Sequence, residues 1–333
     1  MISKRVLLAS AAAIVAATLS FDASAQEKRT FSFGYDQPKP TAYGWTGDYF
    51  EKRLAELSKG TMAINQFPGG QLGQEPQMLQ KIRAGDIDFI ITATANGASI
   101  TPQMGVLSLH FLFENEAHLA KAIGSKELND LMKEMVAETV QGAKMLTLIT
   151  LGFRNIYSKQ PVTKMDDFKG KKVRVQATKT EDTHFPAYGA IPVHMPFGEV
   201  YTSLQTGVVD MAENGVNVYQ TNKHYEVAPV YSMTQHEANN NLIWVSQKTW
   251  DSLNAEQKGW VETVAAEIGA KEPAYALNLE QESAEKLKKL GVKIVDGVDK
   301  SAMITAAKPI QLELAKELGP YAVKVVELVG KLK

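Results

Sequence analysis

Hydrophobic residues recur along the chain with two different periods, one expected of strands and one expected of helices. Short apolar runs predict strands at 30–35, 62–67 and 87–92. Apolar residues three and four positions apart predict helices at 45–58 and from Pro76 to Gly85. Strands that alternate with helices in this way predict an α/β domain with a mainly parallel sheet.

A strand predicted at 145–151 leads through Gly152 into a second unit of the same kind. The apolar pattern of this unit predicts strands at 171–176, 191–195 and 208–211, and a helix at 197–206. No Pro- or Ser-rich linker separates the units at Leu151 and Gly152. A hinge made of strands that cross between the units would not require a linker of distinct composition, so we expect a hinge there.

The last third of the chain has the pattern of a long helix. Asn254 is followed three residues later by Gln257, which is the spacing of a capping box. The helical pattern continues to about Leu290, ends at Gly291 and contains Pro273, where we expect a bend. A helix of this length exceeds the diameter of one small domain and is long enough to span two.

The first 25 residues have the organisation of a cleavable signal peptide. Lys4 and Arg5 precede a short apolar run at 6–19, and Ala23-Ser24-Ala25 fits the small-residue cleavage rule. The run is too short to be a membrane-spanning helix. We therefore expect cleavage after Ala25 and export to the periplasm.

Composition narrows the function classes. The chain has no cysteine, which excludes disulfides, thiolate metal sites and a cysteine nucleophile. Its formal net charge of −1 gives no electrostatic footprint for nucleic acid. About 308 residues remain beyond the signal peptide, enough for two domains of ordinary size.

Two arginines stand out because one lies in a predicted strand, at a position that should carry an aliphatic side chain, and the other follows an apolar strand. Arg174 lies in the strand predicted at 171–176, and Arg154 follows the strand at 145–151. Burying a guanidinium is costly unless an anion meets it. Its fork of N–H groups fits a carboxylate with two hydrogen bonds, so two converging arginines would make a receptor for an organic acid. The pattern alone favours the alternative, in which each arginine is a partly exposed residue in a structural ion pair.

The order and spacing of several motifs point to one protein family. In the second unit they are Gly152–Asn155 (GFRN), Asp167–Val175 (DFKGKKVRV), Pro196–Tyr201 (PFGEVY), Leu204–Asp210 (LQTGVVD) and Glu213–Asn214 (EN). Elsewhere they are Gln66–Gly73 (QFPGGQLG), Ile82–Asp88 (IRAGDID), Thr234–His236 (TQH) and Trp250–Leu253 (WDSL). Together they resemble the DctP-type solute-binding protein of TRAP transporters over nearly the whole mature chain.

The resemblance implies an α/β, two-domain periplasmic-binding-protein fold (class II-like) with a hinge and a long helix that bridges both domains. We expect domain I to comprise 26–151 and 240–279, and domain II to comprise 152–239 and 280–333. We expect the mature protein to be mainly monomeric. The resemblance implies that it works with a sodium-driven membrane permease that lacks an ATPase.

Eight residues are candidates for the ligand site. By resemblance, Arg174 forms the main salt bridge to a ligand carboxylate, Arg154 and Asn214 assist it, and Phe197 packs on the solute. Glu75 would accept hydrogen bonds from ligand hydroxyls, although a first-turn charge favoured by the helix dipole explains it equally well. Phe197 has a structural alternative as a core aromatic. The remaining candidates lie at predicted strand ends, where α/β sheets place ligands, and are Tyr35, Asp36 and Thr94.

The sequence favours a binding protein that captures a small carboxylate and does no chemistry on it, with no cofactor and no metal. The six histidines are scattered without metal-ligand spacing, and nucleotide and nucleophile motifs are absent from the sequence. One alternative is the receptor of an ATP-driven importer. A more distant one is a secreted hydrolase or lyase that uses Glu75 or Asp36 with a histidine.

The pattern leaves the ligand open among dicarboxylates, sugar acids, keto or hydroxy acids and aromatic acids. Phe153, Phe197, Trp45 and Tyr219 hint at an apolar or ring-bearing ligand. The chain departs from the family pattern at His110, where proline is common, and at Gly215, which replaces the proline after Glu-Asn. Both departures weaken the transfer of any one member's ligand to this chain.

Overall fold

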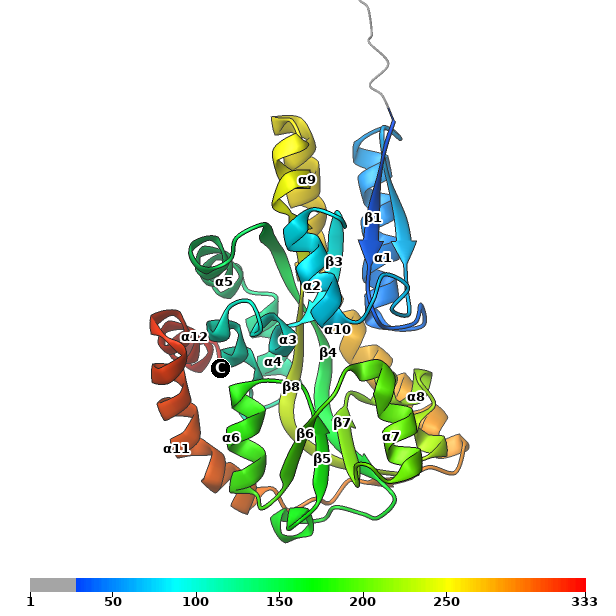
Figure 1. Cartoon of the computed structure of the whole chain (residues 1–333), viewed down its shortest axis with the longest axis vertical. Helices are drawn as coiled ribbons and strands as arrows, with labels where there is room; N and C mark the ends of the chain where they lie inside the picture. The colour runs from blue at the N-terminus through cyan, green and yellow to red at the C-terminus, as the bar shows by residue number, and fades with distance from the viewer. Residues whose placement is uncertain (1–27) are drawn as a thin grey trace, which may run out of the picture.

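The computed structural model describes residues 28–333, so the predicted signal peptide lies outside the described residues. Figure 1 shows an elongated α/β molecule in which helices surround a central sheet. The strands are β1 (Arg29–Gly34), β2 (Met62–Phe67), β3 (Phe89–Ala93), β4 (Ala143–Ser158), β5 (Lys172–Val175), β6 (Ile191–His194), β7 (Met211–Asn214), β8 (Val230–Ser246) and β9 (Lys293–Val295).

Helices make up most of the remaining described chain. The α-helices are α1 (Ala42–Leu57), α2 (Glu75–Ala84), α3 (Thr94–Gly97), α4 (Glu116–Ile123), α5 (Lys126–Thr139), α6 (Lys179–Ala187), α7 (Val200–Thr206), α8 (Val216–Thr221), α9 (Gln247–Ser252), α10 (Ala255–Lys289), α11 (Ser301–Leu318) and α12 (Pro320–Lys331). The 3-10 helices are η1 (Pro102–Ser108), η2 (Met165–Phe168), η3 (Phe197–Glu199) and η4 (His224–Glu226). None of the helices between residues 28 and 333 has the length and apolarity of a membrane span.

Two long strands join the two halves of the molecule. In the described residues the sheet order is β2-β1-β3-β8-β4-β7-β5-β6, with β9 beside β8. We call the part with β1, β2 and β3 the first lobe, and the part with β5, β6 and β7 the second lobe. β4 and β8 pair antiparallel from one lobe to the other, while β1 pairs parallel with both β2 and β3. The sheet is therefore mixed rather than mainly parallel, because the crossing strands run against their neighbours.

The crossing strands are irregular where the lobes meet. The β4–β8 register shifts between Thr150 and Phe153, and Gly152 has φ +78°, a left-handed conformation that favours glycine. A Cβ at Gly152 would lie 2.8 Å from Glu280 Cγ. Close packing and the local backbone conformation both require glycine here, at the position where the sequence predicts a hinge.

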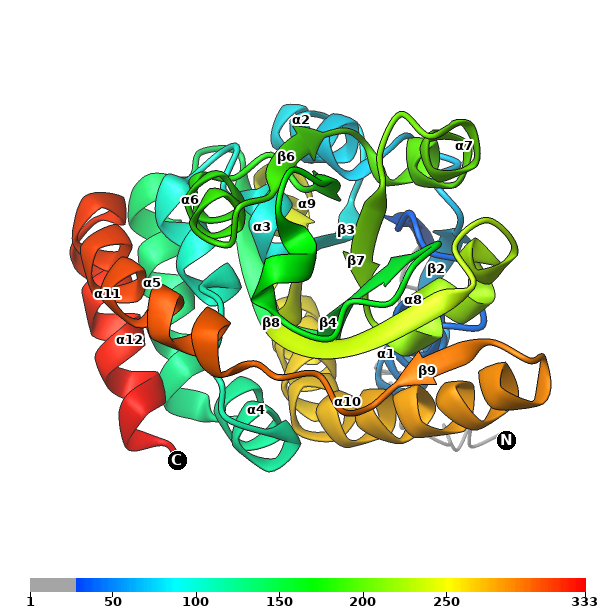
Figure 2. The same cartoon turned by 90° about the horizontal axis from the view of Figure 1, so that it is seen from below.

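The long helix α10 connects the lobes from behind the sheet. It begins at the predicted capping box, in which the side chains of Asn254 and Gln257 bond each other's backbone N–H. Glu272 Oε2 accepts from Thr150 N (2.9 Å) in β4, and Glu280 accepts from the first two N–H groups of α8 (2.6 and 2.7 Å). Figure 2 shows α10 along one side of the molecule, next to α8 and β9. The predicted bend at Pro273 stays a prediction.

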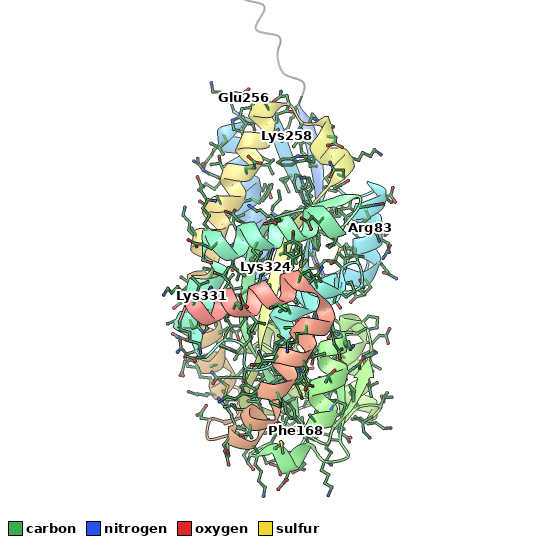
Figure 3. The ribbon with its side chains drawn as sticks, turned by 90° about the vertical axis from the view of Figure 1, so that its left-hand side faces the viewer. Arg83, Phe168, Glu256, Lys258, Lys324 and Lys331 are labelled. Atoms are coloured by element: carbon green, nitrogen blue, oxygen red, sulfur yellow. The ribbon has the colours of Figure 1, made fainter. Side chains whose placement is uncertain are left out.

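Hydrophobic cores lie on both faces of the sheet in each lobe. The core beneath α2 and α5 extends to α12, whose Ala322, Val325 and Val329 are buried in it. Figure 3 shows α12, which carries the labelled Lys324 and Lys331, alongside α5. The predicted domain boundaries stay a prediction, and this packing would place the last helix with the first domain rather than the second.

Two predicted strands differ from the observed ones. β4 does not end at Leu151 but continues to Ser158, so Arg154 lies inside a strand rather than after one. Its charge is tolerated there because Glu213 of the paired strand β7 meets it. β7 starts at Met211, where the predicted strand ended. The prediction stopped there because the polar residues Glu213 and Asn214, which complete the strand, interrupt the apolar pattern.

Candidate functional site

Residues of both lobes line a pair of adjoining cavities, which we call the arginine cavity. One part has a volume of about 190 Å³ and the other about 20 Å³. Both parts are lined by Asp36, Glu75, Asn96, Arg174 and Phe197. Larger hollows of about 320 and 440 Å³ lie elsewhere, but neither is lined by a buried charged group. The arginine cavity is the better candidate because ligand sites combine a concave shape with converging polar groups.

Arg174 projects from β5 and is 3% exposed. Its Nε and Nη2 donate to the backbone oxygen of Met195 at 3.1 and 2.8 Å. Within residues 28–333, no carboxylate oxygen lies within 4.0 Å of its guanidinium. Burial lowers the pKa of Arg174, and the more distant charge of Glu213 opposes this only in part. Arg174 is thus a buried cation that meets a carbonyl but no anion.

Arg154 lines the same cavity but its charge is already matched. Its guanidinium forms a two-pronged ion pair with Glu213, in which Nη2 donates to Oε1 at 2.6 Å. Its Nε also lies 3.3 Å from Glu237 Oε2, and Nη1 donates to Asn239 Oδ1 at 3.0 Å. Burial alone would lower the pKa of Arg154, but Glu213 and Glu237 raise it above its usual value. This geometry makes Arg154 a structural ion-pair residue at the cavity wall.

Two buried carboxyl groups face the cavity from the first lobe. Glu75 is the first residue of α2, and it accepts from Ala93 N (2.8 Å), Asn96 Nδ2 (2.7 Å) and Tyr43 OH (3.2 Å). Burial, together with the charge of the neighbouring Asp36, raises the pKa of Glu75 to about 8. Burial also raises the pKa of Asp36, to about 6, against a hydrogen bond from Gln37 Nε2 (3.1 Å). At neutral pH the pair therefore holds roughly one proton.

Side-chain amides supply much of the remaining polar wall. Asn214 ends β7, and its Oδ1 accepts from Asn239 Nδ2 at 2.7 Å. Asn241 Oδ1 accepts from Tyr43 OH at 2.6 Å. Because alternate residues of a strand face the same side, β8 presents Asn239 and Asn241 to the cavity while Asn240 bonds Leu107 O on the other side. The wall combines donors and acceptors suited to a ligand with several hydroxyls.

Phe197 is the aromatic residue of the wall. It begins η3, is partly buried, and packs against hydrophobic residues of both lobes. Its ring centroid lies 6.0 Å from Arg174 Cζ, at the outer limit of a cation–π contact. Phe197 therefore has the surface of a core residue on one side and lines the cavity on the other.

The structure brings six of the eight predicted site residues to the cavity, namely Arg174, Arg154, Asn214, Phe197, Glu75 and Asp36. The other two do not line it. Tyr35 is fully buried and donates through its hydroxyl to Gln66 Oε1 at 2.8 Å. Thr94 is buried at the start of α3 and donates to Asn240 O at 3.1 Å. Both residues follow strand ends, but their side chains turn into the first lobe.

Most of the aromatic residues that suggested an apolar or ring-bearing ligand pack inside the protein instead of lining the cavity. Phe153 and Tyr219 are buried in hydrophobic clusters, and Trp45 stacks on Tyr275 at 4.9 Å between ring centroids. Only Phe197 of these four lines the cavity. The lining amides of β8 went unpredicted, and the signal for them was Asn239–Asn241, three consecutive asparagines inside a strand that is otherwise apolar towards its end.

Comparison with known proteins identifies the family to which the chain belongs. A sequence model of the family described as bacterial extracellular solute-binding protein, family 7 (DctP), matches residues 33–317. The chain is 29% identical over 296 residues to the 2,3-diketo-L-gulonate-binding periplasmic protein YiaO of Escherichia coli (strain K12). The similarity covers 89% of this chain and 89% of that protein.

Solved structures are similar over nearly the whole described chain. One is the sugar acid binding protein DctPAm from Advenella mimigardefordensis in complex with galactonate, with a TM-score of 0.86 and 27% identity over 92% of this chain and 99% of that chain. Another is a TRAP periplasmic solute binding protein from Pseudomonas putida F1 with bound D-glucuronate. Its TM-score is 0.84, with 26% identity over 91% of this chain and 96% of that chain.

Proposed function

Because the chain belongs to family 7 of the bacterial extracellular solute-binding proteins, the DctP family of TRAP transporters, we propose that it captures a sugar acid in the arginine cavity. The predicted fold class and family are confirmed. The receptor of an ATP-driven importer is not favoured, since the similar structures include TRAP solute-binding proteins. The sugar acid is delivered to a TRAP membrane permease.

One observation carries the proposal, which is that Arg174 is buried without a carboxylate partner. A buried, unpaired guanidinium is costly, and a ligand carboxylate would remove that cost with two hydrogen bonds. Asn214 stands at the end of β7 beside the matched Arg154 and assists from the wall. We assign the carboxylate of the ligand to Arg174 and leave Arg154 in its protein ion pair.

The opposite wall explains why the acid should carry hydroxyl groups. Asp36 and Glu75 hold roughly one proton between them at neutral pH, so they accept hydrogen bonds and also donate one. The asparagine side chains add further donors and acceptors. Phe197 would cover the C–H face of a sugar carbon chain or ring. Dicarboxylates fit less well, because a second anion would meet Asp36 and Glu75.

The similar proteins support the same class of ligand, a sugar acid. The ligands named for them are 2,3-diketo-L-gulonate, galactonate and D-glucuronate, and each is a carboxylic acid with several hydroxyls. We propose that the mature protein begins after Ala25, acts in the periplasm as a monomer and carries out no reaction on the solute. Closure of the lobes about Gly152 would bury the ligand and present a new surface to the permease.

A ligand screen tests the proposal. Purified mature protein is melted with galactonate, D-glucuronate, D-galacturonate and 2,3-diketo-L-gulonate, then with the neutral sugars galactose and glucose, and with succinate. A ligand bound only by the folded state at a hundred times its Kd stabilises it by about 2.7 kcal/mol. We expect at least one sugar acid to raise the melting temperature, and the neutral sugars to have no effect.

Calorimetric titration and NMR complete the test. Titration gives the affinity of each hit, and an NMR spectrum of the recovered ligand shows whether it is unchanged. A response to neutral sugars equal to that of their acids would contradict the role of Arg174. Conversion of the ligand would contradict the absence of chemistry.

A further inference from the structure

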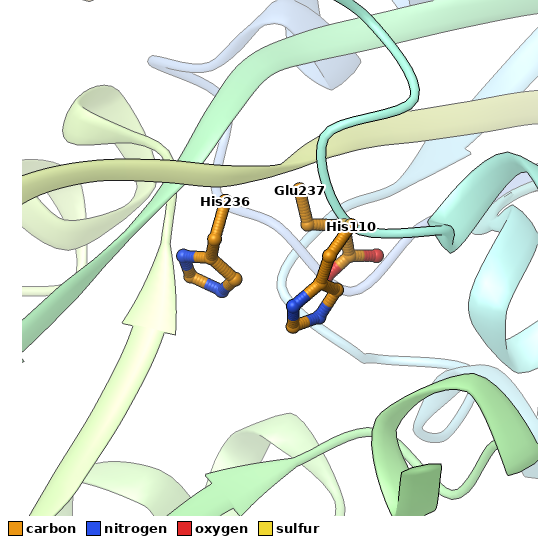
Figure 4. Close-up of side chains that lie close together, drawn as sticks. All are labelled: His110, His236 and Glu237. Atoms are coloured by element: carbon orange, nitrogen blue, oxygen red, sulfur yellow. The ribbon is translucent and has the colours of Figure 1, made fainter. Parts of the chain in front are cut away.

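A second buried polar cluster lies deeper in the second lobe, beside Arg154. We call it the histidine cluster, and its members are His110, His184, His236, Glu181 and Glu237. All five are at most 2% exposed. The ring of His110 stacks on His184 with centroids 4.3 Å apart and meets His236 at 4.8 Å. Figure 4 shows the side chains of His110, His236 and Glu237 lying close together.

Potential metal ligands converge within this cluster. One ligand atom each from His110, His236 and Glu237 can be chosen so that all three lie within 4.8 Å of one another. Glu181 lies next to them, with Oε2 3.3 Å from His110 Nε2. Three segments far apart in sequence supply these groups: the residues after η1, helix α6 and strand β8.

Several of the converging atoms have no hydrogen-bond partner in the described residues. His236 Nε2, Glu237 Oε2 and Glu181 Oε1 are all buried and unpartnered. Glu237 Oε2 is 3.3 Å from Arg154 Nε, but without the geometry of a hydrogen bond. Buried polar groups are rarely left unsatisfied, and several in one place point to a binding site for a group such as an ion.

The charges of this region do not balance. Arg154 contributes one positive charge, whereas the buried carboxylates of Glu213, Glu237 and Glu181 contribute three negative charges when ionised. Lys300 is not paired with any of these carboxylates in the described residues and instead donates to Gln235 Oε1 at 2.6 Å. With all three carboxyl groups ionised, the excess of two negative charges equals the charge of one divalent cation.

The backbone is shaped to make the side chains converge. In a regular strand the adjacent His236 and Glu237 would face opposite sides of the sheet. Gln235, which precedes them, has φ +45°, and Phe111, which follows His110, has φ +55°. Phe111 N donates to His236 O at 2.7 Å, which ties the two histidine-bearing segments together. Non-glycine residues in this conformation are strained, and such strain clusters at functional sites.

We propose that His110, His236 and Glu237 bind one divalent transition-metal ion, with Zn²⁺ the best match, and that Glu181 completes the site. Imidazole and carboxylate ligands suit Zn²⁺, which takes four ligands in a closed structural site. Ca²⁺ and Mg²⁺ favour sites made of oxygen atoms. The ion would cross-link β8, α6 and the segment after η1 behind Arg154, and so stiffen the second-lobe wall of the arginine cavity.

Protons offer the competing way to balance the charge. Glu181 and Glu237 lie close enough for a hydrogen bond when one of them is protonated. In that case the cluster takes up no metal, and chelators leave its stability unchanged. The metal-bound and the protonated forms of the cluster therefore differ in the number of metal ions per chain, which can be measured directly.

Metal content of protein made without a polyhistidine tag tests the proposal. The protein is unfolded with a chelator, refolded with Zn²⁺, Mn²⁺ or Co²⁺, dialysed, and analysed by inductively coupled plasma mass spectrometry. We expect about one Zn²⁺ per chain in the wild type, and an affinity lower by about tenfold or more in Glu237→Gln and in His236→Gln. His118→Gln is the matched control, because His118 is a buried histidine outside the cluster.

The visible spectrum of the Co²⁺-loaded wild type gives a second measurement that needs no variant. Absorption bands of four-coordinate Co²⁺ with nitrogen and oxygen ligands support the site even where a variant fails to fold. A wild type that retains no metal from any of the three ions, or equal retention by wild type and both variants, would overturn the proposal. Sugar-acid affinity is titrated separately, so failure here is distinct from failure of the proposed function.

Discussion

The arginine cavity and the histidine cluster are both buried and charged, but the group that lacks a partner has the opposite sign in each. In the cavity, the guanidinium of Arg174 meets a backbone carbonyl and no carboxylate in the described residues. Beside the cluster, Arg154 is surrounded by more carboxyl groups than one cation can match. A buried cation without a contacting anion calls for an anion, and buried carboxylates without a contacting cation call for a cation or for protons.

The contrast shows why two arginines in apolar strands should not be given the same role. Arg154 and Arg174 are equally buried, and both line the cavity. What separates them is the partner that each already has within the protein. Arg154 contributes to the folded state through Glu213, whereas Arg174 remains available to a ligand.

Arg154→Met should have the largest effect on stability, because Arg154 is the arginine that already has a partner within the protein. The change removes one partner of a buried ion pair and leaves the carboxylate of Glu213 without its cation. Such changes cost about 3–5 kcal/mol of the free energy of unfolding. Urea unfolding measures the effect as a lower midpoint at an unchanged slope.

Arg53→Met is the control for this prediction, because Arg53 pairs with Glu267 at the surface and exposed ion pairs contribute little. Its unfolding midpoint should stay near that of the wild type. Wild-type stability in Arg154→Met would show that the ion pair with Glu213 does not hold the fold.

Asn239→Ala should affect both regions, because Asn239 joins them. Its Oδ1 accepts from Arg154 Nη1, and its Nδ2 donates to Asn214 Oδ1 in the cavity wall. Loss of an acceptor for a buried charged donor should lower the free energy of unfolding by about 1.5–3 kcal/mol. Sugar-acid affinity should fall as well, as measured by calorimetric titration.

Asn240→Ala is the matched control, since Asn240 is the next residue of β8 and bonds Leu107 O away from the cavity. It should lower stability without changing affinity. An equal loss of affinity in both variants would mean that Asn239 acts on binding through the fold alone.

Glu75→Gln should produce the smallest change, in the pH dependence of stability. Burial raises the pKa of Glu75 to about 8, so from about pH 5 to 8 the folded state keeps a proton that the unfolded state has released. The stability of ligand-free protein should therefore fall as pH rises through this window. Glu75→Gln should make this fall shallower, because glutamine does not titrate. Asp36 and Glu280 keep part of the slope, since burial raises the pKa of each.

Melting curves at a series of pH values measure this effect. Glu327→Gln, at an exposed position on α12, serves as the control and should retain the wild-type slope. A steeper fall in Glu75→Gln than in the wild type would contradict the sign of the pKa shift.

The sequence was sufficient to predict the features that depend on local pattern. The capping box of Asn254 and Gln257, the strand at 62–67 and the glycine at the hinge all appear where local chemistry demands them. Arg174 could be selected because a charge inside an apolar strand is visible in the sequence. Which residue meets that charge depends on strands that are distant in the chain.

Features created by tertiary contacts could not be predicted from the sequence. The partner of Arg154 is Glu213, 59 residues away, so the ion pair could not be told from a ligand site. The histidine cluster joins His110, His184 and His236, whose spacing follows no metal motif. It forms because a left-handed Gln235 turns two neighbours of β8 to the same side. The prediction that Tyr35 and Thr94 line the cavity was wrong, because a strand end fixes the position of a residue but not the direction of its side chain.

Arg174→Lys tests the central claim most directly, through calorimetric titration of a sugar acid together with melts of the ligand-free protein. Lysine keeps the charge but loses the two-pronged geometry, so binding should weaken by about 2–5 kcal/mol, on the order of a hundredfold or more in Kd. The ligand-free melting temperature should change little, because Arg174 has no protein carboxylate to abandon. Unchanged affinity with a lowered ligand-free melting temperature would contradict the account, since Arg174 would then be an internal structural residue.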